Sequence, residues 1–132
     1  MYKHTLKEVS QRIQGDTEPS AGCNPVIAIK EWVDDWNRHH QVEMVREEPL
    51  WILDDHWYWV NLWMAGAAEY AAFLTDAQAP EWTADPRYFS KKPILAGGPN
   101  ARHYALMETP FAWRLRMLFS GRTTLRGLTS NG

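Results

Sequence analysis

The chain is poor in the residue types that build disulfide-bonded, zinc-binding and membrane-spanning proteins. Cys23 is the one cysteine among 132 residues, so the sequence excludes an internal disulfide and a zinc site made of paired cysteines. Apolar residues never run for the roughly 18 to 20 positions that a bilayer span needs. Asp54 and Asp55 precede the tryptophan-rich stretch and Asn61 interrupts it, so we expect no transmembrane helix.

Signals for export and for catalysis are missing as well. The first fourteen residues have no apolar centre and no small-residue cleavage site, so they do not resemble a secretory signal, and we expect a cytoplasmic protein. There is no glycine-rich phosphate loop and no nucleophile elbow. The sequence therefore predicts a protein that is not an enzyme and binds no cofactor.

Each part of the chain lacks charges of one sign. Residues 1–85 hold six Lys and Arg against fifteen Asp and Glu, whereas residues 87–132 hold eight basic residues and one acid, Glu108. We therefore divide the chain into an acidic, tryptophan-rich part (1–86) and a basic part (87–132). The two parts either neutralise each other in the fold or present opposite charges to different partners.

Tryptophan is abundant, with eight residues in 132, five of them between Trp51 and Trp82. Such a density has two explanations, which the sequence leaves open. The rings fill a small core, or they form an aromatic surface that a partner covers, because tryptophan dominates the energetics of protein interfaces.

The pattern of apolar residues predicts an all-α fold, a single compact domain (1–132) of about five helices with an irregular Pro/Gly-rich connection before the C-terminal helices. Capping signals such as Thr5 with Glu8 mark where helices begin. No segment alternates with period two for long enough to predict a strand. We expect helices over residues 5–15, from Pro25 onward, around Val42–Val45, from His56 to about Thr75, over Ala101–Met107 and from Pro110 to Gly121.

Two clusters invite a chemical interpretation. Asp35 with His39, and the adjacent His40, have helical spacing that suits a metal, but no second pair completes such a site. We therefore expect no metal, and place the acids of this helix on a solvated face. Asp54 with Asp55 and His56 resembles an acid–base cluster, although acids that cap a helix explain the same residues.

The basic part offers a surface for polyanions. Arg114 and Arg116 flank Leu115 on the predicted last helix, and Arg122 follows. Phosphate binding needs such clusters, so a nucleic-acid-binding regulator is the alternative function. These arginines otherwise pair with the acids of the first part and have a structural role.

The C-terminal half of the chain resembles that of a family of small bacterial proteins associated with toxin–antitoxin gene pairs. The resemblance lies in two segments, PEWTADPRYF (80–89) and GGPNARHYALMETPFAWRLRMLF (97–119). Consecutive arginines are typical of the family, and here Leu115 separates them. The resemblance implies an antitoxin-like protein with a toxin partner and no catalytic residues. The matching residues are Pro80, Trp82, Asp85, Pro86, Phe89, Glu108, Thr109, Pro110, Phe111, Arg114, Arg116 and Phe119.

The sequence thus predicts a non-enzymatic, antitoxin-like protein that binds and neutralises a protein toxin encoded nearby, with no membrane association. Homo-oligomers and a nucleic-acid partner remain open. The residues expected to bind the partner are Trp57, Trp59, Trp63, Asp54 and Asp55.

Overall fold

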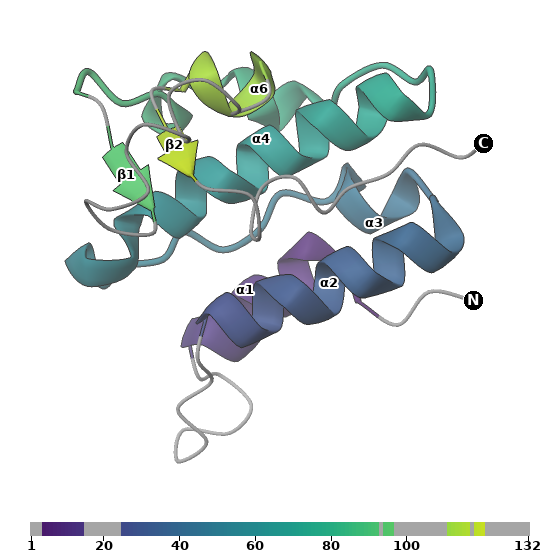
Figure 1. Ribbon diagram of the computed structural model, residues 1–132, viewed down its shortest axis with the longest axis horizontal. Helices are drawn as coiled ribbons and strands as arrows, with labels where there is room; N and C mark the ends of the chain where they lie inside the picture. Colours follow the sequence, from purple (N-terminus) through teal and green to yellow (C-terminus); the bar gives the residue numbers. More distant parts are fainter. Residues whose placement is uncertain (1–3, 15–24, 93, 97–110, 117, 121–132) are drawn as a thin grey trace.

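The computed structural model describes residues 4–14, 25–92, 94–96, 111–116 and 118–120. In this part of the chain, α1 and α2 pack together on one side of the long helix α4, and α6 packs along the other side (Figure 1). The elements are α1 (Leu6–Gln14), α2 (Pro25–His39), α3 (Glu43–Arg46), η1 (Asp55–Trp57), α4 (Tyr58–Leu74), η2 (Glu81–Ala84), η3 (Pro86–Tyr88), β1 (Ile94–Ala96), α6 (Phe111–Arg114) and β2 (Leu118–Ser120).

The all-α fold class is confirmed, and α1 and η1 begin at the capping residues that the sequence indicates. The backbone N–H of Glu8 donates to Thr5 Oγ1 at 3.1 Å, as a capping box requires. Asp54 caps η1 by accepting a hydrogen bond from the N–H of His56, and α4 follows without a break. The predicted helix over Ala101–Met107 lies outside the described residues.

The core explains half of the tryptophans. Trp32, Trp36, Trp63 and Trp113 are fully buried. Trp32 stacks on Trp36 and meets Trp63 edge-on, with ring centroids 5.9 and 5.8 Å apart. Four large rings at the meeting point of α2, α4 and α6 fill the space between these helices, so the apolar stripe of α4 is covered by its own domain.

The end of the described chain corrects the predicted last helix. α6 stops at Arg114, and residues 118–120 form a strand instead. This strand pairs in parallel with Ile94–Ala96, the register joining Ile94 to Leu118. Each strand is only three residues long, too short for a period-two pattern to be visible in the sequence.

Gly66 lets α6 approach α4 closely, and its replacement gives a first prediction. A Cβ at this position would lie 2.8 Å from Cγ of Trp113 and nearer still to other atoms of that ring. We expect Gly66→Ala to lower the free energy of unfolding by about 2 kcal/mol, although alanine normally favours a helix interior over glycine. Urea unfolding measures this change, and an increase in stability would contradict the packing described here.

Candidate protein-binding site

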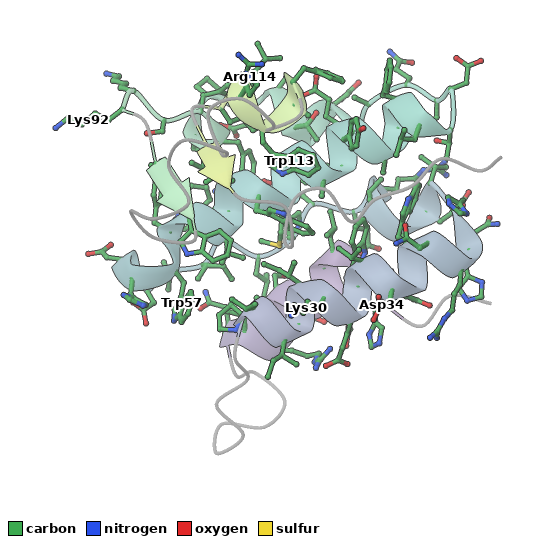
Figure 2. All side chains as sticks on the ribbon, viewed as in Figure 1. Lys30, Asp34, Trp57, Lys92, Trp113 and Arg114 are labelled. Carbon is green, nitrogen blue, oxygen red and sulfur yellow. The ribbon has the colours of Figure 1, made fainter. Side chains whose placement is uncertain are left out.

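One exposed corner of the molecule combines acidic and aromatic side chains. This acidic corner consists of Leu53, Asp54, Asp55, His56, Trp57 and Trp59 and lies at the start of α4, where Figure 2 labels Trp57. Leu53 is 77% exposed, the largest exposure among the large hydrophobic side chains described. Asp54, Asp55 and His56 are also exposed. The corner therefore presents an apolar side chain beside two carboxylates.

The backbone of the acidic corner is fixed on both sides of Leu53. The buried side chain of Asn61 accepts a hydrogen bond from the N–H of Ile52 at 2.7 Å and donates one to its carbonyl at 3.1 Å. On the other side, the Asp54 carbonyl accepts from the N–H of Trp57 and the Asp54 carboxylate accepts from the N–H of His56. Because these bonds hold the preceding and following residues, the position of Leu53 is set before any partner arrives.

The tryptophans expected at this site have different environments. Trp57 and Trp59 are half-buried, their ring centroids 6.2 Å apart, and His56 packs edge-on against Trp57. Trp63, in contrast, has no exposed surface, and its carbonyl accepts a hydrogen bond from Nε1 of Trp113. The structure therefore does not place Trp63 on the surface where a partner was expected to contact it, because this part of α4 faces the core.

Most acidic side chains outside the corner are neutralised within the fold. Asp54 and Asp55 form no ion pair with any residue that the structure describes. Their charge is thus available to an approaching molecule. The described ion pairs with arginine or lysine are Glu8 and Glu31 with Arg12, Glu43 with Arg46, Glu47 with Lys7, Glu48 and Asp85 with Arg87, and Glu69 with Arg116. Glu8 and Glu31 also contact His4, and Asp35 contacts His39.

The arginines of the predicted polyanion surface separate into an exposed and a buried residue. Arg114 is exposed on α6 (Figure 2). Arg116 is 1% exposed and donates to Glu69 Oε1 at 2.6 Å and to the carbonyls of Ala112 and Thr83 at 2.7 and 2.8 Å. Arg116 therefore has the structural role and does not reach a phosphate, while Arg122 lies outside the described residues.

A second aromatic surface lies at the opposite end of α4, and the sequence did not reveal it. Phe73 and Phe111 are 64% and 42% exposed, with ring centroids 5.3 Å apart, and Tyr70 packs against both. Leu115, 60% exposed, follows α6. The predicted helix from Pro110 to Gly121 would include Leu115, but α6 ends at Arg114, so helical periodicity does not apply to Leu115.

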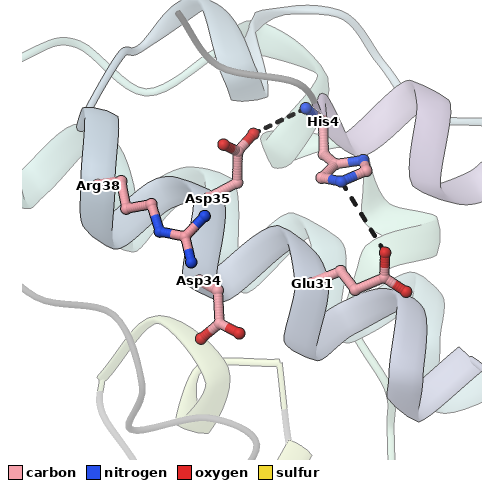
Figure 3. A pocket seen from close by; sticks show the side chains of 5 residues that line it. All are labelled: His4, Glu31, Asp34, Asp35 and Arg38. Carbon is pink, nitrogen blue, oxygen red and sulfur yellow. Dashed lines mark hydrogen bonds and ion pairs between the residues drawn. The ribbon is translucent and has the colours of Figure 1, made fainter.

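A small pocket lies on α2 beside the residues that precede α1, and Asp35, one member of the predicted Asp35 and His39 pair, lines it. Its lining residues are His4, Glu31, Asp34, Asp35 and Arg38 (Figure 3). Asp35 is only 5% exposed, which corrects its assignment to a solvated face: its carboxylate accepts from the N–H of His4 at 2.8 Å and lies 3.4 Å from His39 Nε2. Within the described part of the chain, no group of three or more potential ligands has the geometry to hold a metal ion.

A cluster of side chains around Tyr88 joins the basic part of the chain to the acidic part. The guanidinium of Arg87 lies over the rings of Trp51 and Tyr88, 5.0 and 5.2 Å from their centroids, and pairs with Glu48. Burial, and then the hydrogen bond to Glu48, raise the pKa of the Tyr88 hydroxyl. The hydrogen bond to Glu48 is likewise the main cause that raises the pKa of Arg87. The tyrosine is held neutral, which suits a packing role.

Comparisons with protein-family models, with curated proteins and with solved structures found no match to this chain. Among the described residues, no helix has the length and apolar character needed to cross a bilayer. The geometry of the acidic corner is therefore the observation from which a function is argued.

Proposed function

We propose that the protein is a non-enzymatic, antitoxin-like protein that binds and neutralises a protein toxin through the acidic corner. The observation that carries the proposal is the placement of two exposed carboxylates, Asp54 and Asp55, beside exposed Leu53 and half-buried Trp57 and Trp59; neither carboxylate has an ion pair within the described part of the chain. The resemblance of the C-terminal segments to proteins of toxin–antitoxin gene pairs supplies the class of partner.

This arrangement has the properties of a protein interface. Tryptophan side chains contribute a large part of the binding energy when a partner covers them. Unpaired carboxylates attract a basic surface and accelerate its approach. Many toxins act on anionic substrates such as nucleic acids, and a site that binds phosphates is basic. An acidic surface that covers such a site blocks it.

The test is a stoichiometric complex with the protein encoded by the neighbouring gene. We expect co-expression to yield this complex and to relieve any growth arrest that the neighbouring protein causes alone. Replacing both half-buried rings, Trp57→Ala with Trp59→Ala, should weaken the complex at least about 30-fold, because each such truncation costs more than 1 kcal/mol at a hot spot. Titration calorimetry with the purified proteins measures the change.

Phe73→Ala is the matched control, since it removes an exposed aromatic ring at the other end of the same helix. It should leave the affinity unchanged. If the wild-type protein forms no complex with its neighbour, or if the double variant binds normally while its circular dichroism shows a folded protein, the proposed function is wrong.

The alternative, a nucleic-acid-binding regulator, is favoured by one observation. Arg114 is exposed on the same short helix as Phe111, whose ring is one of the exposed aromatics described above. A basic group beside aromatic rings suits single-stranded nucleic acid, whose bases stack on such rings. Binding to an oligonucleotide that weakens steeply with salt, and less steeply in Arg114→Ala, would support this alternative.

A further inference from the structure

Leu53 is an exposed aliphatic side chain on a backbone segment that hydrogen bonds hold in place. Its neighbour Ile52 is 2% exposed and has both backbone groups bonded to Asn61. A side chain that projects from a fixed backbone loses little conformational freedom when it binds, which favours affinity. Exposure of a leucine alone would carry no weight, since isolated apolar residues are normal on protein surfaces.

The charges beside Leu53 restrict the kind of partner. Asp54 and Asp55 follow it directly, and neither has an ion-pair partner among the described residues. Anionic lipid headgroups and nucleic-acid phosphates would be repelled by two adjacent carboxylates. A basic protein surface, in contrast, gains favourable interactions with both.

We infer that Leu53 is the anchor of the interface, inserting into an apolar pocket on the toxin whose rim carries arginine or lysine residues that pair with Asp54 and Asp55. The inference rests on the proposed function and specifies the chemistry of the partner's surface. Trp57 and Trp59 pack on the core and form the flank that excludes water from the contact.

The experiment measures the affinity of the purified neighbouring-gene protein for four variants at low and high salt. We expect Leu53→Ala to weaken binding about 30-fold at both salt concentrations, because an apolar anchor is insensitive to screening. Asp54→Asn with Asp55→Asn should weaken binding about tenfold at low salt and much less at high salt. Asparagine retains the oxygen that caps η1, so the backbone of the corner is preserved.

Two variants on α2 serve as matched controls. Ile27→Ala shortens another exposed aliphatic residue, 55% exposed, and Asp34→Asn neutralises another exposed acid for which the structure describes no ion pair. Both should bind as the wild type does.

The possible outcomes separate the inference from the proposed function. If the Trp57/Trp59 double variant loses affinity while Leu53→Ala binds normally, the inference is wrong and the function stands. If neutralising Asp54 and Asp55 leaves the salt dependence of the affinity unchanged, the inference that the partner's pocket has a basic rim is wrong. If the wild-type protein does not bind the neighbouring-gene protein at all, both the inference and the proposed function are wrong.

Discussion

Replacing Arg116 with methionine is expected to lower the free energy of unfolding by about 3 kcal/mol. Removing one partner of a buried ion pair leaves the other uncompensated, which costs about 3 to 5 kcal/mol. We expect the lower end of this range because Glu69 retains 27% of its side-chain exposure. The carbonyls of Ala112 and Thr83 also lose their donor. Urea unfolding followed by tryptophan fluorescence measures the loss.

Arg114→Met provides the control within the same segment. Arg114 is exposed, so its replacement should change stability by less than about 0.5 kcal/mol. A double variant, Arg116→Met with Glu69→Met, should recover part of the loss because no unpaired charge then remains. Equal stability of Arg114→Met and Arg116→Met would show that Arg116 does not occupy the buried position described here.

The ion pair of Arg116 shows that part of the charge asymmetry of the sequence is neutralised within the fold. Its pair with Glu69 and the pair of Arg87 with Glu48 both join the basic part of the chain to the acidic part. Neutralisation within the fold was one of the two explanations that the sequence left open. It holds for these two arginines, whereas Arg114, Asp54 and Asp55 have no ion pair among the described residues.

Three of the residues that carry the family resemblance, Trp82, Asp85 and Phe89, make contacts within the fold. Trp82 donates from Nε1 to the Val45 carbonyl at 3.3 Å, and the Asp85 carboxylate caps η3. The ring of Phe89 lies 4.7 Å below the guanidinium of Arg116. These contacts join the segment to α3 and to Arg116, and none of the three residues belongs to the acidic corner.

The helices of the acidic part could be predicted from sequence because local rules determine them. Thr5 caps α1, proline begins α2, and the long alanine-rich stretch without proline after His56 forms α4. The end of α6 and the parallel strand pair could not be predicted in this way. The pairing joins residues 94 and 118, which are far apart in the sequence, so no local pattern encodes it.

The acidic corner was predicted in part. Tryptophan next to aspartate at a helix start drew attention to Asp54, Asp55 and Trp57, all of which lie in the corner. Leu53 was missed because a single leucine has no periodicity, and its exposure follows from a contact in three dimensions. The bonds from Asn61 draw Ile52 into the core, which leaves the next side chain on the opposite side of the extended chain.

Replacing Asn61, which holds the backbone of Ile52, is expected to have the second large effect on stability. Asn61→Leu has a similar volume but no amide, so the N–H and the carbonyl of buried Ile52 both lose their partner. An unsatisfied buried group costs about 1 to 3 kcal/mol, and we expect a loss of about 3 kcal/mol for the two together. Urea unfolding measures the loss, and hydrogen exchange at the Ile52 amide should become faster than in the wild type.

Gln41→Leu is the control, because Gln41 also donates from its amide to a backbone carbonyl, that of His39, but in an exposed position. Water replaces this bond, so stability should change by less than about 0.5 kcal/mol. If the proposed function is right, Asn61→Leu should also weaken the proposed complex under conditions in which the protein remains folded, since Leu53 would no longer be held in place. If stability fell while the affinity was fully retained, the bonds of Asn61 would support the fold alone, and a fixed base for Leu53 would not be needed for binding.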